Sequence, residues 1–167
     1  MRQSWRAELG EFYAANADSA KRLAYLLTGD KQLAEDITQD AFVKMAGRLG
    51  GLRNRDASAA YLRQTVVNLS RAHFRRKKVE RNYLQREASV HRMETVEGRD
   101  VLVSDALWRE LERLTYRQRS AVVLRYYEDL SEHQAAEVLG CSVGALKALT
   151  NRAMGQLRAR VGSEAVT

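Results

Sequence analysis

Three carboxylates on one predicted helix are the side chains that could support metal-ion or acid–base chemistry. Glu35, Asp36 and Asp40 lie close together at helical spacing, as in carboxylate-bridged metal sites of helical bundles. Such sites also need a histidine three residues after a glutamate on the same helix face. No histidine follows any of these carboxylates at that spacing, since nearby positions hold residues such as Gln39 and Phe42, and the three histidines of the chain are scattered over separate predicted elements. The pattern therefore does not favour an enzyme, and we expect neither a metal nor another cofactor.

A run of cations further along the chain suits the binding of phosphates. The segment SRAHFRRKKVER, residues 70–81, carries six basic residues against one acidic residue, Glu80. Solvated helix surfaces usually pair opposite charges four residues apart, and this run has almost no such partners, so a polyanion is its better complement. Tyr61 and Phe74 interleave with the run and could stack on unpaired bases. The alternative, that these rings belong to the core, is stronger for Phe74 than for Tyr61.

Residues 130–153 have the pattern of a helix-turn-helix. Ser131 and Gln134 have the spacing of a capping box at a helix start, and Gly140 suits the left-handed residue that ends such a helix. Ser142 is the expected N-cap of a second helix. In DNA-binding proteins with this motif, the second helix enters the major groove.

Lys147, Asn151 and Arg152 are placed on that second helix to contact DNA. An ordinary helical hairpin inside a core would give the same pattern, so the pattern alone favours DNA only modestly. The net charge of +7 over 167 residues strengthens the case, because it suits a partner that carries phosphates or an acidic surface.

Composition also bounds the fold and the compartment. The chain has no proline and few β-branched runs, so we predict an all-α protein. The single cysteine, Cys141, excludes an intramolecular disulfide and a cysteine-based zinc cluster, and its place in the helix-turn-helix turn indicates a structural role. We find no apolar run of bilayer-spanning length and no signal-peptide core near the first residues, so we expect no membrane insertion and a cytoplasmic location.

Apolar spacing predicts the helices that position these side chains. The expected helices span residues 3–15, 18–27, 31–48, 59–81, 105–114, 116–129, 131–139 and 143–161. Gly29 is expected to close the second, and Asp56 or Ser58 to cap the fourth. Thr115 with Gln118 should form another capping box.

Residues 82–103 separate two groups of helices, because their periodicity weakens and their charges mix. We therefore predict two small helical domains, residues 1–81 and residues 104–162, joined by a flexible linker over residues 82–103. In the second domain, the helix that Ser104 caps should turn its leucines inward: Leu107, Leu111 and Leu114.

The chain resembles an extracytoplasmic-function sigma factor, a small bacterial type that keeps two domains of the larger housekeeping factors. RLAYLLTGDKQLAEDITQDAFVKM, residues 22–45, resembles regions 2.1–2.2 of that family. AYLRQTVVNLSRAHFRRKK, residues 60–78, resembles regions 2.3–2.4, and residues 130–153 resemble region 4.2. The motifs follow the family's order and spacing over nearly the whole chain. The stretches FYAANADSAKRLAYLLTGD and YLRQTVVNLSR are similar to an actinobacterial sigma-E-like subgroup.

This resemblance implies a protein that brings core RNA polymerase to promoter DNA, with the transcription chemistry left to the polymerase. The family's polymerase-binding helix docks on the clamp helices of the β′ subunit, and it matches five residues here: Glu35, Asp36, Gln39, Asp40 and Phe42. An acidic patch on a basic protein would complement a basic partner surface. The β subunit is a further expected partner. An anti-sigma factor, if one exists, would cover the polymerase-binding and −35 surfaces.

The resemblance also implies two sets of DNA contacts. The loop over residues 47–56 matches a segment that receives a base flipped from the −10 element, and the implied −10 contacts are Arg53, Tyr61, Asn68, Arg71, Arg75 and Arg76. Asn68 would line that pocket, where an amide can pair with a base edge. Tyr61 would help to hold the opened strand, and the arginines would grip its backbone.

The implied −35 contacts are Ser142, Gly144, Lys147, Asn151 and Arg152. Many family members carry Gly-Thr-Val-Lys-Ser-Arg where this chain has GALKAL, residues 144–149. The missing Thr and Arg remove a hydrogen-bond donor and a phosphate contact. Either Lys147, Asn151 and Arg152 carry more of the binding, or the −35 sequence differs.

Two other classes of protein fit parts of the pattern. A helix-turn-helix regulator that acts without polymerase would need only duplex DNA, so co-purification with core polymerase separates it from a sigma factor. An RNA-binding helical protein would also explain the arginine run, and it would prefer structured RNA to promoter DNA.

Overall fold

The computed structural model describes residues 2–48, 55–84 and 105–164. The chain divides into two compact units, Met1–Ser104 and Asp105–Thr167. Every element in the described residues is helical, which confirms the predicted all-α fold. The predicted linker and domain boundaries stay predictions, because residues 85–104 lie outside the described part of the chain. None of the helices in the described part combines the length and the apolar character needed to cross a membrane.

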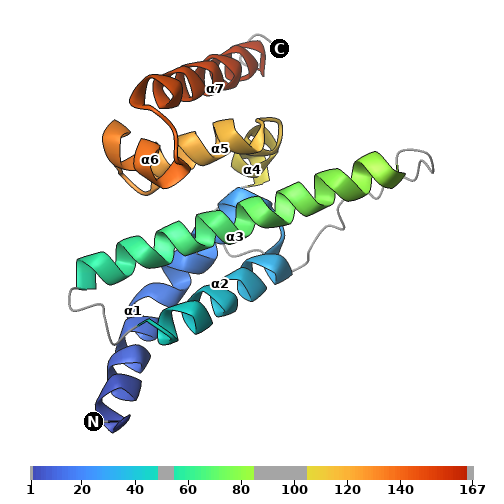
Figure 1. Ribbon diagram of the computed structural model, residues 1–167. Coiled ribbons are helices and arrows are strands. Elements are labelled where there is room, and N and C mark those ends of the chain that lie inside the picture. Colours follow the sequence, from blue (N-terminus) through green and yellow to red (C-terminus); the bar gives the residue numbers. More distant parts are fainter. Residues whose placement is uncertain (1, 49–54, 85–104, 165–167) are drawn as a thin grey trace. The chain divides into compact units, whose positions relative to one another are not determined.

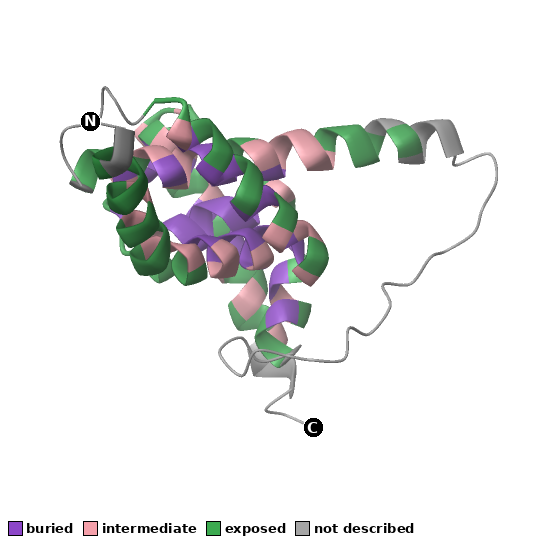
Figure 2. Cartoon of the chain, turned by 90° about the horizontal axis from the view of Figure 1, so that it is seen from below, coloured by how far each residue is buried: buried purple, intermediate pink, exposed green. Residues whose placement is uncertain are grey.

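The first unit is a bundle of three helices, α1 (Arg2–Thr28), α2 (Lys31–Ala46) and α3 (Arg55–Leu84), and each packs on the other two (Figure 1). Its buried residues lie between the helices, while the far end of α3 is more exposed (Figure 2). The largest side chains that are almost fully buried come from all three helices: Leu23, Leu27, Met45, Val66 and Val67.

A single helix, α1, stands where two helices were predicted, so the break expected between residues 15 and 18 is wrong. Asn16 does not interrupt the helix. Its side-chain amide donates to the Phe12 carbonyl one turn earlier, at 2.9 Å, so its polar group is satisfied while the backbone stays helical. Gly29 ends α1 as predicted, with a positive φ of 71° that favours glycine.

The connection from α1 to α2 needs only Gly29 and Asp30. Asp30 is the N-cap of α2, and its carboxylate accepts a hydrogen bond from the Leu33 amide at 3.0 Å. Two helices joined so tightly form an αα-hairpin. The third helix, α3, packs against both helices of this hairpin.

The start of α3 differs from the prediction. The helix begins at Arg55, so neither Asp56 nor Ser58 is its N-cap. Asp56 lies in the first turn, where a carboxylate favours the positive end of the helix dipole. Ser58 is buried within the helix. At the other end α3 continues to Leu84, beyond the predicted end at residue 81.

The second unit contains α4 (Asp105–Glu112), α5 (Tyr116–Val122), a π-helical turn η2 (Val123–Tyr127), α6 (Glu132–Leu139) and α7 (Val143–Glu164). Both predicted capping boxes are present. The Thr115 hydroxyl accepts a hydrogen bond from the backbone N–H of Gln118 at 3.2 Å. The Ser131 hydroxyl accepts one from the backbone N–H of Gln134 at 3.1 Å.

The inward face of α4 is rotated from the prediction. Leu111 and Leu114 are buried, but Leu107 is 47% exposed. Trp108 is buried instead and carries the Arg119 guanidinium 5.3 Å from its ring centroid. Consecutive helical residues point about 100° apart, and the large indole takes the inward position because it removes more apolar surface from water.

The turn of the helix-turn-helix depends on Gly140. Its φ is 67°, and the next amide, of Cys141, donates back to the Ala136 carbonyl at 3.0 Å. This is a Schellman-type helix end, which a residue with a Cβ adopts only with strain. Cys141 is half-buried beside it, as its predicted structural role requires.

Gly140→Ala should destabilise the second unit, because the left-handed conformation costs a non-glycine residue about 1 kcal/mol or more. The melting temperature should fall by about 4–8 °C for a unit of this size. Gly155→Ala is the matched control, because Gly155 lies inside α7 with nothing within 4 Å of an added Cβ. It should raise the melting temperature. Equal effects of the two variants would contradict the assigned role of Gly140.

Candidate nucleic-acid and partner-protein interfaces

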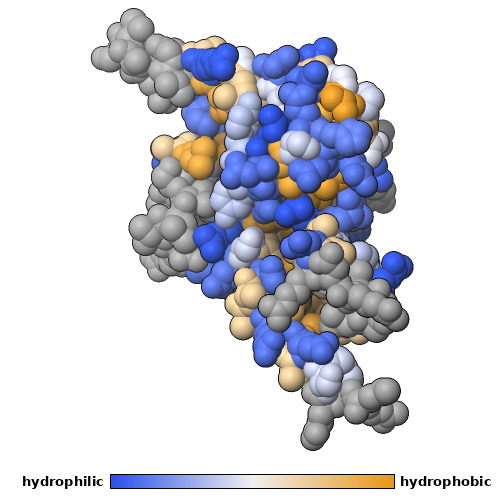
Figure 3. All heavy atoms as spheres, turned by 90° about the vertical axis from the view of Figure 1, so that its left-hand side faces the viewer, coloured by the Kyte–Doolittle hydropathy of each residue, from blue (hydrophilic) through white to orange (hydrophobic). Residues whose placement is uncertain are grey.

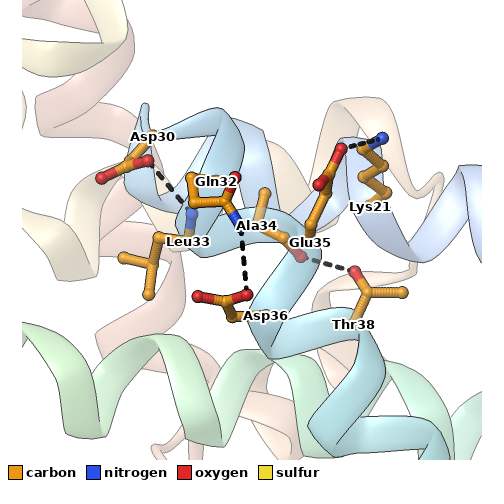
Figure 4. Close-up of polar contacts among 8 residues, drawn as sticks. All are labelled: Lys21, Asp30, Gln32, Leu33, Ala34, Glu35, Asp36 and Thr38. Atoms are coloured by element: carbon orange, nitrogen blue, oxygen red, sulfur yellow. Dashed lines mark hydrogen bonds and ion pairs between the residues drawn. The ribbon is translucent and has the colours of Figure 1, made fainter. Parts of the chain in front are cut away.

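The outer side of α2 carries polar residues, and its inner side is apolar. Ala34, Ile37, Ala41 and Met45 are buried against the rest of the first unit. Asp36, Gln39 and Asp40 are exposed, as was predicted for the two aspartates. Asp36 accepts a hydrogen bond from the Gln32 amide at 3.3 Å, one turn away on the same helix (Figure 4).

Glu35 differs from its acidic neighbours because it is engaged within the unit. Its carboxylate lies 2.7 Å from the Lys21 ammonium of α1 (Figure 4). The hydrogen bond from Lys21, followed by the charge of Lys21, lowers the pKa of Glu35 from its ordinary value of 4.5. This ion pair links α1 to α2, so Glu35 is less available to a partner than Asp36 or Asp40.

Phe42, which was predicted to contact polymerase, lies in the core of the first unit, and that role stays a prediction. It is only 6% exposed, and its ring lies edge-on to Phe12 at 6.0 Å and to Tyr13 at 4.8 Å. Such aromatic pairs favour one relative orientation of the rings. Phe42 therefore fixes α1 against α2 and offers little surface to a partner.

Val43 is an exposed apolar residue of α2 that was not among the predicted site residues. It is 70% exposed, and it lies outside the inner stripe of Ile37, Ala41 and Met45. An apolar residue off the buried stripe of an otherwise clean amphipathic helix is the signal that could have revealed it. The structure thus adds an apolar side chain to the same helix that carries the exposed aspartates.

An apolar groove of about 390 Å³ runs beside Val43 between α1 and α2. Its apolar lining consists of Trp5, Leu9, Tyr13, Phe42, Val43 and Ala46. Trp5 and Tyr13 are 39% and 47% exposed. On the face of the molecule drawn in Figure 3, most described side chains are hydrophilic and the hydrophobic ones form separate patches.

Along α3, four residues of the predicted −10 set share one side. Tyr61, Asn68, Arg71 and Arg75 are separated by seven, three and four residues, which places them on one stripe of a helix. The stripe is about 21 Å long at 1.5 Å per residue, close to the length of six stacked base pairs. Leu62, Val66 and Ser70, on the opposite side, are buried.

The members of this α3 stripe differ in exposure. Asn68 and Arg75 are exposed, while Tyr61 and Arg71 are half-buried. The side-chain oxygen Oδ1 of Asn68 accepts a hydrogen bond from the side-chain amide of Gln64 at 3.1 Å. Arg76 is exposed but lies about 100° around the helix from Arg75.

Tyr61, at the start of the α3 stripe, is held by a cation. The Arg48 guanidinium lies 5.5 Å from the Tyr61 ring centroid, within the range of a cation–π interaction. Arg53, predicted for the −10 contacts, lies outside the described residues, as do residues 49–54 of the loop. Tyr61 and Phe74 are both half-buried, so burial does not separate the two interpretations of these rings.

His73 belongs to the inner side of the basic run. Its Nε2 atom is buried and has no hydrogen-bond partner within the described structure. Burial, followed by the charges of Lys77 and Arg76, lowers the pKa of His73 from its ordinary value of 6.5, while Asp30 and Glu80 act in the opposite direction. The imidazole is thus kept neutral and adds no charge to the run at neutral pH.

The predicted −35 residues cluster at the start of α7. The Ser142 hydroxyl accepts from the Ala145 amide at 3.1 Å and caps the helix. Gly144, Lys147 and Asn151 are exposed and share one side of the helix, and Arg152 is exposed beside them. Leu146 and Ala153 on the other side are fully buried. The Lys147 ammonium lies 3.4 Å from the Glu132 carboxylate of α6.

No group of three or more His, Cys, Asp and Glu side chains in the described residues is placed to hold a metal ion. The described residues instead present exposed carboxylates on α2, exposed arginines on α3, an apolar groove between α1 and α2, and exposed polar residues near the N-terminus of α7.

Comparisons with known proteins identify both units. Residues 12–80 match the family model "Sigma-70 region 2", and residues 104–157 match "Sigma-70, region 4". The chain is 32% identical to the RNA polymerase sigma-E factor of Streptomyces avermitilis, over 93% of this chain and 86% of that protein. It is 30% identical to the ECF RNA polymerase sigma factor BldN of Streptomyces coelicolor, over 89% of this chain and 58% of that protein.

A solved structure has the same fold. It is the sigma factor RpoE of Bartonella quintana in complex with the anti-sigma factor NepR, with a TM-score of 0.73 and 20% identity. The match covers 93% of this chain and 97% of that one.

Fold and surfaces define an all-helical DNA-binding protein of two units with a helix-turn-helix in the second. The chain belongs to the sigma-70 family of RNA polymerase sigma factors and is of the extracytoplasmic-function type. Its regions 2 and 4 support promoter recognition directed through polymerase, so the alternative of a regulator that acts alone is not favoured.

The Glu35–Lys21 pair predicts a measurable titration. The Glu35 carboxyl should titrate below its ordinary value of 4.5, and Lys21→Met should raise its pKa towards that value. A depressed folded pKa gives stability that is present above the unfolded pKa and is lost as pH falls through the folded one. NMR titration of the glutamate carboxyl carbons, in the wild-type protein and in Lys21→Met, measures this. An unchanged Glu35 titration in Lys21→Met would contradict the pairing.

Proposed function

We propose that this protein acts in the bacterial cytoplasm, binds core RNA polymerase through α2 and places α3 and α7 on the −10 and −35 elements of promoters. In this proposal it positions polymerase and helps to separate the strands, and it catalyses no reaction itself. The observation that carries the proposal is the division of charge within the first unit. The α2 helix exposes carboxylates and a valine, while α3 exposes the cations Arg75 and Arg76.

The proposed polymerase-binding surface consists of Asp36, Gln39, Asp40 and Val43. Exposed carboxylates suit the basic surface of a protein partner, and an apolar side chain among them supplies the desolvated contact that protein interfaces need. Glu35 and Phe42 act indirectly, since the ion pair to Lys21 and the packing on Phe12 and Tyr13 hold α2 in place.

The proposed −10 surface is the α3 stripe with Arg76 beside it and Arg53 in the preceding loop. Tyr61 offers an aromatic face for a base. Asn68 offers an amide for a base edge, and Arg71, Arg75 and Arg76 neutralise backbone phosphates.

The proposed −35 surface begins at the N-terminus of α7, where backbone amides and the helix dipole favour a phosphate. Gly144 leaves this end uncovered, because an added Cβ would meet no atom closer than the Ser142 hydroxyl at 4.0 Å. Ser142 positions the helix through its cap, while Lys147, Asn151 and Arg152 reach the groove and the backbone. An anti-sigma factor is a further proposed partner, since a protein of the same fold has been solved in complex with one.

Asp40→Arg should reduce the affinity for purified core polymerase by at least about tenfold, because a like charge would then face the partner. Val43→Asp should weaken binding as well, through loss of apolar contact. Fluorescence polarisation of labelled protein against core enzyme measures both. Asp18→Arg is the control, with the same charge change at an exposed position of α1. Unchanged affinity of Asp40→Arg would remove α2 from the interface.

Replacing Arg75 and Arg76 with alanine should weaken complexes of the reconstituted holoenzyme with a promoter fragment. The dependence of log K on log salt should become shallower by about 0.7–0.9 per lost phosphate contact. Binding measured over a range of KCl concentrations gives this slope. Arg113→Ala, an exposed arginine outside the proposed surfaces, should leave the slope unchanged. A wild-type slope in the double variant would assign the two arginines another role.

A further inference from the structure

Within the helix-turn-helix, an acidic side chain of α6 forms an ion pair with a lysine of α7. The Glu132 carboxylate lies 3.4 Å from the Lys147 ammonium, and the two side chains are 41% and 58% exposed. Glu132 belongs to the first turn of α6 and Lys147 to the exposed side of α7. The pair therefore lies on the surface through which the motif is proposed to meet DNA.

This pair is not needed to hold the fold. Ion pairs between exposed side chains contribute little to stability. The capping box of Ser131 and Gln134 begins α6, and Ser142 begins α7. The two helices pack on each other, and each contributes buried apolar residues, Ala135 and Leu139 from α6 and Leu146 from α7. The Glu132 carboxylate therefore contributes little to the stability of the fold, but it reduces the positive charge of this surface.

We propose that Glu132 is a specificity-determining residue that weakens sequence-independent binding of duplex DNA by occupying Lys147. This inference rests on the proposed DNA-binding role of α7. A phosphate that approaches Lys147 must displace the carboxylate or share the ammonium with it. Either way, part of the favourable electrostatic contribution of Lys147 is lost before DNA arrives.

The consequence concerns the balance between the two kinds of DNA contact. Phosphate contacts give affinity without sequence information, and base contacts give specificity. By offsetting the charge of Lys147, Glu132 lowers the affinity that comes from phosphate contacts. The contacts of Asn151 and the neighbouring backbone stay unchanged. Binding then depends more on base recognition and on attachment to polymerase, which suits a chain with a net charge of +7.

A double-mutant cycle tests whether Glu132 acts through Lys147. Affinity for a labelled duplex of random sequence is measured by fluorescence anisotropy at about 50 to 200 mM KCl. Glu132→Gln in the full chain should tighten binding roughly two- to fivefold at the low-salt end, as for an exposed pair. Lys147→Gln should weaken binding. Glu137→Gln is the matched control, because it removes the same charge from an exposed position of the same helix.

The cycle distinguishes direct repulsion from action through Lys147. If Glu132 acts by occupying Lys147, then Glu132→Gln should have no larger effect than Glu137→Gln when Lys147 is already glutamine. An equal gain in both backgrounds, or an equal gain from Glu137→Gln in the wild-type background, would overturn the inference. Circular-dichroism melting of each variant verifies that the fold is retained.

The outcomes also separate this inference from the proposed function. If Lys147→Gln weakens DNA binding while Glu132→Gln changes nothing, the inference fails and the role of α7 stands. If Lys147→Gln and Arg152→Ala both leave duplex binding unchanged, the role of α7 in binding DNA fails as well.

Discussion

The packing of the inner face of α3 against α1 and α2 is the constraint on which the first unit depends. Val66 and Val67 are fully buried and Leu62 is nearly so. Because a helix is rigid, burying that side turns Tyr61, Asn68, Arg71 and Arg75 outward together. The same core holds α2 by Ile37, Ala41 and Met45, which turns Asp36, Asp40 and Val43 to solvent. A small apolar core thus sets the direction of the two proposed binding surfaces, which carry opposite charge.

In the second unit, the ends of the helices fix the direction of the exposed side chains. Two capping boxes begin α5 and α6, the left-handed Gly140 ends α6, and the Ser142 hydroxyl caps the start of α7. Once Ser142 fixes the start of α7, helical spacing alone places Gly144, Lys147 and Asn151 on one side. The Lys147–Glu132 pair then adjusts the charge of that side without taking part in the core. Geometry and affinity are therefore controlled by different residues.

Much of this could be predicted from the sequence, where local chemistry decides the outcome. The caps at Thr115 and Ser131, the stop at Gly29 and the exposure of Asp36 and Asp40 depend on residue type and spacing within one or two turns. The −10 and −35 assignments came from family resemblance, and they remain predictions about contacts with partners.

The features that could not be predicted depend on contacts between helices or on side-chain geometry. Apolar spacing predicted a break between residues 15 and 18, but the side-chain hydrogen bond from Asn16 to the Phe12 carbonyl satisfies its polar group and α1 continues. Phe42 was assigned to a partner surface, and only the positions of Phe12 and Tyr13 reveal that it is buried. The engagement of Glu35 by Lys21 and of Lys147 by Glu132 joins residues of different helices, and no local pattern in the sequence announces such pairs.

Run-off transcription with purified core RNA polymerase tests the central claim most directly. Fragments that cover the source genome serve as templates, with core enzyme alone as the reference. A sigma factor should yield discrete products that start at defined positions and appear only when this protein is added. The absence of any such product from every fragment, with a core enzyme that is active with another sigma factor, would contradict the account.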